Sequence, residues 1–325
     1  MKSFILTILT CSSLVSMPFN VFGQGVFPER NLRLIVPQSA GGPSDVLGRT
    51  LGQKLSDTLG KAVVIENKPG AGGNIGSDMV AKSKSDGHTI LINIAGILAI
   101  NETLYKTMPF HAEKDLDGLG KIGSSNMVLV AHPSFAPNTV SELVAFVKSK
   151  PIYTFSYGSA GTGSPQHIGG ELLNTKAGIK LTHVPYKGAV PALTDLLGGQ
   201  IPLAIVGLPA ALQQIKAGKL KAIAIFGHNR SAHAPDVATF VESGFPEIEM
   251  DLVYGLFVAA GTPKAIINRL SQDISTILRT ADVKDKLLTN GFELAESTPK
   301  ELDDYLKNEI EKWRPIVRDS GAVAN

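Results

Sequence analysis

Residues 32–59 read LRLIVPQSAGGPSDVLGRTLGQKLSDTL and contain the repeating unit from which the predicted fold is built. Leu32–Val36 is a short apolar run with β-branched residues, which is typical of a buried strand. Glycine and small polar residues follow, and they predict a turn. The next segment, Asp45–Leu59, carries four leucines at helical spacing: Leu47, Leu51, Leu55 and Leu59. The stretch therefore predicts a strand, a glycine-rich turn and a helix, with Ser44 or Asp45 as the helix cap.

The same alternation of strand and helix patterns continues along the chain. Two helix starts carry a capping box, Thr139 with Glu142 and Thr298 with Glu301. Further short apolar runs predict strands at Ala62–Glu66, His88–Asn93, Met127–Ala131, Thr154–Tyr157, Leu181–Val184, Leu203–Val206, Ala222–Phe226 and Tyr254–Val258. Strands that alternate with helical segments such as Ser141–Lys150 predict parallel sheets covered by helices on both faces. We therefore expect an α/β protein.

The C-terminal part of the chain has a different pattern. Lys264–Ser320 is predicted to be helical, apart from a break at Asn290-Gly291 and a short apolar piece, Phe292–Ala295. Because no strand remains there to form a separate sheet, these helices are expected to pack on the N-terminal sheet. This predicts a discontinuous first domain, residues 24–131 and 252–325, and a second domain, residues 132–251. Two chain segments then connect these two α/β domains and form a hinge, with a cleft between the lobes.

The N-terminus and the composition limit the partners of the protein. Residues 1–23 combine Lys2 with the apolar run Phe4–Met17, which is too short to span a bilayer, and predict a cleavable signal peptide. The single cysteine, Cys11, lies within it, so the mature protein is expected to have no thiol for disulfide bonds or catalysis. The net charge of +2 gives no reason to expect nucleic acid as a partner. A soluble monomer in the periplasm is predicted.

Glycine-rich turns that follow predicted strands are the candidate binding elements. They lie at residues 37–45, 67–76, 157–167 and 185–189, two in each predicted lobe. Backbone N–H groups at helix starts attract anions, so the turns could converge on one anionic ligand. None is a nucleotide motif, because Gln166 stands where the pair Gly161 and Gly163 would need a third glycine, and no cofactor is expected. The seven histidines contain no i, i+4 pair, and no metal site is predicted.

These strings resemble the Bug family, the periplasmic solute-binding proteins of tripartite tricarboxylate transporters. The resemblance extends from about Leu32 to Ala322. The strings that carry it are Leu34–Pro37 with Gly41, Gly42 and Asp45; Val64–Gly76; Asp86–Thr89; Tyr157–His167; Val184–Gly188; and Ile215–Leu220. The resemblance implies a two-lobed periplasmic-binding-protein fold, type II-like, that closes over a small carboxylate held by backbone N–H groups, hydroxyls and water.

The resemblance also implies which residues bind the ligand. They are Gln38, Ser39, Gly41, Gly42, Ser44, Ala95, Gly96, Ser159, Thr162, Gly163, Ser164, His167, Lys187, Gly188 and Gly207. The chain departs from many relatives in two places: Gln38 and Ser39 replace aromatic or proline residues, and Val206-Gly207 stands where an aspartate is common. Because an acidic group to hold an ammonium is missing from the pattern, we expect a ligand with carboxylates and without an amine. Gln38 and Ser39 add hydrogen-bond donors, so a second polar or carboxylate group is expected at the far end of the ligand, as in an aliphatic or aromatic dicarboxylate.

The predicted function is an extracytoplasmic solute-binding protein. It would capture a small organic acid by lobe closure and deliver it to the membrane subunits of a tripartite tricarboxylate transporter. It is not expected to be an enzyme, and no catalytic residue is assigned. Two alternatives stay open. One is a secreted hydrolase that uses Ser164 and His167, although neither Ser159 nor Ser164 lies in the Gly-x-Ser-x-Gly motif of a nucleophilic serine. The other is a ligand sensor whose closed form docks on a membrane kinase.

Overall fold

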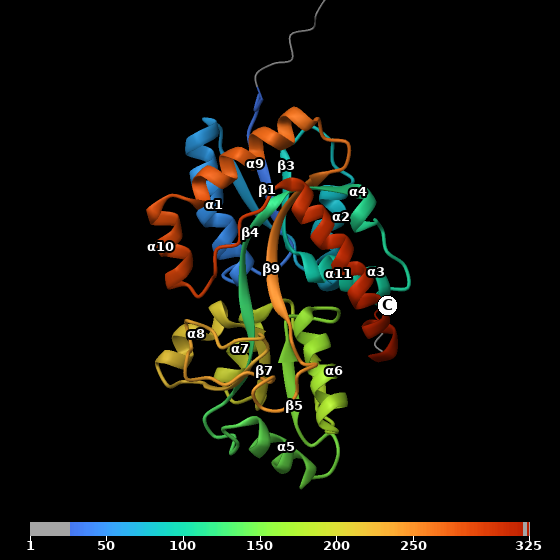
Figure 1. The fold of residues 1–325 in the computed structure, drawn as a ribbon, viewed down its shortest axis with the longest axis vertical. Coiled ribbons are helices and arrows are strands. Elements are labelled where there is room, and N and C mark those ends of the chain that lie inside the picture. Colours follow the sequence, from blue (N-terminus) through green and yellow to red (C-terminus); the bar gives the residue numbers. More distant parts are fainter. Residues whose placement is uncertain (1–26, 321–323, 325) are drawn as a thin grey trace, which may run out of the picture.

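The structure, a computed structural model, describes residues 27–320 and residue 324 of the chain. The predicted signal peptide, residues 1–23, and Cys11 lie outside the described residues. Figure 1 shows two lobes, one above the other, with strands β4 (Leu116–Ala131) and β9 (Asp251–Ala259) running between them. Within the described part of the chain, no helix is long and apolar enough to cross a membrane.

The order of elements confirms the α/β class. The remaining strands are β1 (Leu32–Val36), β2 (Val63–Asn67), β3 (Thr89–Ile94), β5 (Ser156–Ser159), β6 (Thr182–Pro185), β7 (Leu203–Gly207) and β8 (Lys221–Ile225). The helices are α1 (Pro43–Leu59), the 3-10 turn η1 (Ala71–Gly73), α2 (Asn74–Ala81), α3 (Ala95–Leu104), α4 (Ala112–Asp115), α5 (Val140–Lys148), α6 (Pro165–Ala177), α7 (Ala189–Leu197), α8 (Leu208–Lys216), α9 (Lys264–Leu278), α10 (Ala281–Thr289) and α11 (Pro299–Ser320).

The sheet is mixed, so the expectation of purely parallel sheets is wrong. In the upper lobe the order is β2-β1-β3-β9-β4, with β1 parallel to β2 and β3 but β9 antiparallel to both β3 and β4. In the lower lobe β5 pairs in parallel with β6 and β7, whereas β7 and β8 run antiparallel to β4. Each antiparallel pair contains β4 or β9, the two strands that carry the chain from one lobe to the other and back, so the direction of these strands follows from the excursion.

Strand β4 belongs to both lobes. Its first part, Leu116–Asn126, pairs with β9, and its last part, Met127–Ala131, pairs with β7 and β8. The sequence predicts only the second part as a strand. The two lobes therefore share a continuous hydrogen-bonded strand, which links them more closely than two loops would.

The C-terminal helices pack on the N-terminal elements, as the sequence predicts. Helix α11 contacts α3 and β4, and α9 contacts α1. Figure 1 shows α11 beside α3, and Ala324 N donates to Leu104 O at the C-terminal end of α3. The predicted helical stretch has one further break, at Arg279-Thr280 between α9 and α10. The division of the chain at residues 131 and 252 stays a prediction.

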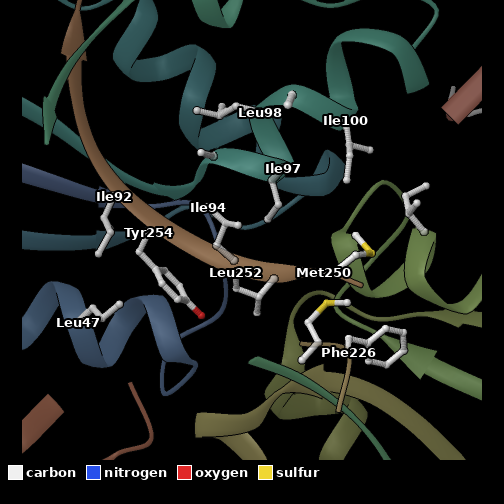
Figure 2. Close-up of a cluster of buried hydrophobic side chains, with 14 of the residues drawn as sticks. Leu47, Ile92, Ile94, Ile97, Leu98, Ile100, Phe226, Met250, Leu252 and Tyr254 are labelled. Atoms are coloured by element: carbon white, nitrogen blue, oxygen red, sulfur yellow. The ribbon is translucent and has the colours of Figure 1, made fainter. Parts of the chain in front are cut away.

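One apolar core runs through the waist of the molecule. It includes Ile94 and Ile97 of the upper lobe, Leu252 of β9, and Met250 and Phe226 on the lower side. Figure 2 shows these side chains gathered along the curved strand β9. The core thus forms the apolar base of the space between the lobes.

Candidate ligand-binding site

A cavity of about 480 Å³ lies between the two lobes. The upper lobe contributes the turns after β1 and β2 and the two ends of α3, and the lower lobe contributes the turns after β5 and β6. The lining residues are Pro37, Gln38, Pro69, Gly70, Ala71, Gly72, Gly73, Ile97, Tyr105, Ala160, Gly161, Thr162, Ser164, Pro185, Tyr186, Lys187, Gly188 and Ala324. All four glycine-rich turns of the sequence therefore meet around the two adjoining cavities of this cleft.

A smaller chamber of about 30 Å³ adjoins the cavity. The two spaces share Gln38, Ile97 and Ala160. The other residues that line the chamber are Ser39, Gly42, Pro43, Ser44, Ile94, Gln166, Ala189, Gly207, Leu252 and Tyr254. Its apolar side is the β9 region of Figure 2, where Leu252 and Tyr254 lie near Ile94. The chamber has room for about one or two water-sized groups.

The N-terminal ends of six α-helices line these two spaces. Helices α1, α2, α3, α6, α7 and α8 each contribute a residue from the first turn or from the residue before it. The first N–H groups of a helix lack partners within the helix and carry its positive dipole end. Among the described residues that line the two spaces, Lys187 is the single charged one. The arrangement can hold an anion with backbone dipoles, hydroxyl groups and one exposed ammonium.

Asp45 organises the first turn and does not cap α1. Helix α1 begins at Pro43 after Gly42, and no side chain caps it, so the predicted cap at Ser44 or Asp45 is wrong. The Asp45 carboxylate instead accepts hydrogen bonds from Gly41 N at 2.9 Å, Arg49 Nε at 2.9 Å and Asn67 Nδ2 at 3.0 Å. Burial alone would raise the pKa of Asp45, but these donors hold it below its usual value. Because the side chain is committed to the turn, the helix start remains open toward the chamber.

Glycines at two positions allow the turns of the two lobes to approach each other closely. Gly188 has φ 128°, and a Cβ there would lie 2.2 Å from Ser39 Oγ of the opposite lobe. Gly72 has φ 60°, and its Cβ would lie 2.8 Å from Thr162 O. Tyr105 spans the same gap, since its hydroxyl lies 3.5 Å from Thr162 O. The glycines therefore allow an approach of the turns that any side chain would block.

A histidine pair, the buried His167 and the half-buried His183, supports the turn between β5 and α6. The rings of His167 and His183 stack with centroids 4.0 Å apart, and Ser159 Oγ lies 2.6 Å from His183 Nε2. Gly163 N donates to His167 Nδ1 at 3.3 Å. Burial lowers the pKa of His167, and burial together with the neighbouring His167 lowers that of His183 to about 3. Both rings are therefore neutral near pH 7, and His167 Nδ1 acts as an acceptor for the backbone of the turn.

Nine of the residues implied as ligand-binding line the two spaces: Gln38, Ser39, Gly42, Ser44, Thr162, Ser164, Lys187, Gly188 and Gly207. The other six lie outside the lining and support it: Gly41, Ala95, Gly96, Ser159, Gly163 and His167. Gly41, for example, binds Asp45, and Ser159 binds within its own turn through Gly161 N at 3.1 Å. Direct contact of any of the fifteen residues with a ligand stays a prediction.

Several lining residues are absent from the predicted set. Tyr105 lies at the C-terminal end of α3, and Ala324 reaches the cavity because its N–H donates to Leu104 O at 3.0 Å. Gln166 and Tyr254 line the chamber. The glycine-rich string at residues 67–76 was a signal for the Pro69–Gly73 side of the cavity, but no local pattern marks Tyr105 or Ala324.

Comparison with known proteins gives consistent matches over most of the chain. A family model described as "Tripartite tricarboxylate transporter family receptor" matches residues 47–322. Protein BugT of Bordetella pertussis is 34% identical over 297 residues, which cover 91% of this chain and 91% of BugT. The structure of MatC from Rhodopseudomonas palustris with bound malate is 30% identical, with a TM-score of 0.85 over 90% of this chain and 100% of MatC. The structure of R. palustris Rpa4515 with adipate is 30% identical, with a TM-score of 0.87 over 91% of this chain and 99% of Rpa4515.

Proposed function

The chain belongs to the family of tripartite tricarboxylate transporter receptors, and we propose that it captures a small organic dicarboxylate by closure of its two lobes. Proteins of this family are solute-binding proteins rather than enzymes, and similar structures hold malate and adipate, both of which are dicarboxylates. The family inferred from the sequence is therefore confirmed, and similar proteins are known with a carboxylate bound. The ligand of this chain and its delivery to membrane subunits are the proposal.

The observation that carries the proposal is the convergence of helix starts on an almost uncharged cleft. Six helix N-termini and Lys187 favour an anion, whereas no aspartate or glutamate lines either space among the described residues. A ligand ammonium would find no carboxylate partner in this lining. The geometry therefore supports a ligand with carboxylates and without an amine.

The hydrolase alternative has no support in the hydrogen bonds of the turn. Ser164 Oγ donates to Gly161 O at 2.7 Å and accepts from His167 N at 3.2 Å, which is the geometry of a helix cap. The ring nitrogen of His167 that bonds within the described protein, Nδ1, accepts from Gly163 N. The serine hydroxyl and the imidazole are thus each used by the backbone of the turn.

Export to the periplasm and delivery of the ligand to the permease complete the proposal. The predicted signal peptide and the family assignment support both steps. A ligand-dependent contact with a sensor kinase is the alternative fate of the closed form. Copurification of the ligand-loaded protein with the permease subunits or with a kinase distinguishes the two.

The proposal is tested with ligand-free protein, prepared by unfolding and refolding. Thermal shift and calorimetry are run with mono-, di- and tricarboxylates and with the amine derivative of each dicarboxylate; an ester panel is tested for turnover. We expect stabilisation by dicarboxylates above their amine derivatives, and no turnover. Binding of amino acids alone would overturn the amine-free class, and ester turnover that disappears in Ser164→Ala would overturn the carrier function.

A further inference from the structure

Three buried polar atoms beside the small chamber have no hydrogen-bond partner among the described residues. They are Gln38 Oε1, Ser39 Oγ and Gln166 Oε1, and all three residues line the chamber. Buried polar atoms are nearly always paired in folded proteins, and exceptions need an explanation. Their gathering at one end of the cleft indicates a polar group of the ligand at this place.

The hydrogen bonds around Gln38 establish which end of its amide is unpaired. Ile94 N is an unambiguous donor, and it lies 2.8 Å from Asn93 Oδ1, so this atom is the carbonyl oxygen of Asn93. Gln38 Nε2 lies 3.1 Å from the same oxygen. If the Gln38 amide were flipped, two carbonyl oxygens would face each other, which is unfavourable.

The amide nitrogen of Asn93 also fits the assignment of Oδ1 as the carbonyl oxygen. Its Nδ2 donates to Ser77 Oγ at 3.0 Å, and Ser77 Oγ donates onward to Gly73 O at 2.9 Å. Asn93 and Ser77 are fully buried, so the network is shielded from solvent. Gln38 is therefore held with one N–H on Asn93 and with Oε1 as a buried acceptor at the junction of cavity and chamber.

A buried carbonyl acceptor selects for a donor on the ligand. A carboxylate placed against Gln38 Oε1 would bring two acceptors together. An ammonium is a donor, but among the described residues that line the chamber none is charged and could offset the desolvation of the ammonium. A hydroxyl group fits both the chemistry and the volume of about 30 Å³, and its oxygen can accept from the Ser39 hydroxyl.

We propose that Gln38 and Ser39 form a subsite for a hydroxyl group, so that the protein prefers carboxylates that carry a hydroxyl over the same skeleton without one. The inference rests on the proposed function, because the carboxylates would occupy the larger cavity beside Lys187. It refines the role of Gln38, which acts through Oε1 as an acceptor for a hydroxyl, whereas the sequence predicts it as a donor to a second polar or carboxylate group.

The test compares matched ligand pairs by calorimetry on the ligand-free full-length mature protein. Succinate is paired with malate and glutarate with 2-hydroxyglutarate, and a further pair is built on whichever skeleton binds best in the carboxylate panel. We expect the hydroxylated member to bind about five- to tenfold more tightly, the range of one net hydrogen bond. Gln38→Met and Ser39→Ala should each bring this ratio toward one and change the affinity for the deoxy member little.

Lys187→Met is the control, because it should weaken both members of a pair and leave the ratio unchanged. Deoxy ligands that bind as tightly as hydroxylated ones to the wild-type protein would overturn the subsite while leaving the proposed function intact. The same holds if the amino derivative binds best, or if Gln38→Met and Ser39→Ala weaken both members equally. Failure of every carboxylate to bind would overturn the proposed function itself.

Discussion

Gly188 is the residue at which the approach of the lobes can be tested most directly. Its backbone lies in a region that only glycine adopts readily, and a Cβ would lie 2.2 Å from Ser39 Oγ. We expect Gly188→Ala to lower the free energy of unfolding by roughly 1–3 kcal/mol. Affinity for the best carboxylate should fall by more than about tenfold, because the methyl group holds the turns apart.

Gly218→Ala is the matched control for Gly188→Ala. Gly218 also has a positive φ, 67°, but nothing lies within 4 Å of its Cβ position. Its substitution should cost stability, by about 1 kcal/mol, and leave affinity unchanged. Calorimetry and urea unfolding measure both quantities. Equal affinity loss in the two variants would mean that backbone strain, and not contact between the lobes, explains the effect.

The neutral histidine pair predicts that stability falls in acid. His183 has its pKa lowered to about 3, by burial and by the neighbouring His167, whereas an unfolded histidine titrates near 6.5. Between these values the unfolded chain binds a proton that the folded protein does not, so stability is complete above about pH 6.5 and declines as the pH falls toward 3.

The limiting slope is about 1.4 kcal/mol per pH unit for one proton. His183→Gln removes this titration, so the loss of stability between pH 7.5 and 4.5, measured by urea unfolding, should be smaller by roughly 2–3 kcal/mol than in the wild-type protein. His228→Gln changes an exposed histidine of the same lobe and should leave the decline as it is. An unchanged decline in His183→Gln would show that His183 is not buried as a neutral ring.

At the scale of the element, helix starts were more predictable than the central strand. The capping box at Thr298 is confirmed, since Thr298 N donates to Glu301 Oε2 at 2.8 Å and Glu301 N donates to Thr298 Oγ1 at 3.3 Å. At Thr139 half of the box forms: Glu142 N donates to Thr139 Oγ1 at 3.2 Å, but the Glu142 carboxylate accepts from Asn138 N at 2.7 Å. Such caps involve residues three apart, so the local sequence contains the whole interaction.

The first half of β4 was missed for a physical reason. It is rich in glycine, which is depleted in strands. A Cβ at Gly118 would lie 2.6 Å from Asp303 Oδ1, and one at Gly120 would lie 2.5 Å from Ser297 O. These neighbours lie more than 170 positions away along the chain. The glycines are therefore explained by the close approach of the chain at the start of α11, and no local pattern reveals a contact at that separation.

The candidate site likewise has features that the local sequence predicts and features that depend on tertiary contacts. The glycine-rich turns were found, because a turn and the helix start after it are local features. The partners that give each turn its chemistry were not, since Gln38 depends on Asn93 and the cavity wall at Tyr105 depends on the orientation of α3. Sequence patterns thus located the backbone of the site, and the side-chain roles required the tertiary structure.

Thr298 offers a test of how α11 is held. Its hydroxyl accepts from Glu301 N at 3.3 Å, and the helix that it caps contacts α3 and β4. Thr298→Ala should lower the free energy of unfolding by about 1 kcal/mol, and Thr298→Ser should restore most of it. Ligand affinity should be unchanged in both, because the cap lies outside the cavity lining. A serine variant as unstable as the alanine variant would show that the cap hydrogen bond is not the cause.

At the scale of the whole molecule, the two lobes are connected by strands rather than by flexible loops. β4 and β9 pair along most of their length and continue from one lobe into the other. A hinge of paired strands restricts the lobes to opening and closing about one region, which keeps the turns of the two halves aligned. The near-neutral net charge of +2 is consistent with the proposed capture of an anion by helix dipoles that come together when the lobes close.

Closure predicts a ligand-dependent change in shape that small-angle scattering can detect. The radius of gyration should decrease when the best carboxylate of the panel is added to ligand-free protein, because the lobes approach across the cleft. Gly188→Ala, at a ligand concentration that saturates it, should compact less, since its added methyl group lies where Ser39 meets Gly188. Gly218→Ala should compact as fully as the wild-type protein. An unchanged radius of gyration in the saturated wild-type protein would contradict closure, and the ligand would then bind to a cleft that is already shut.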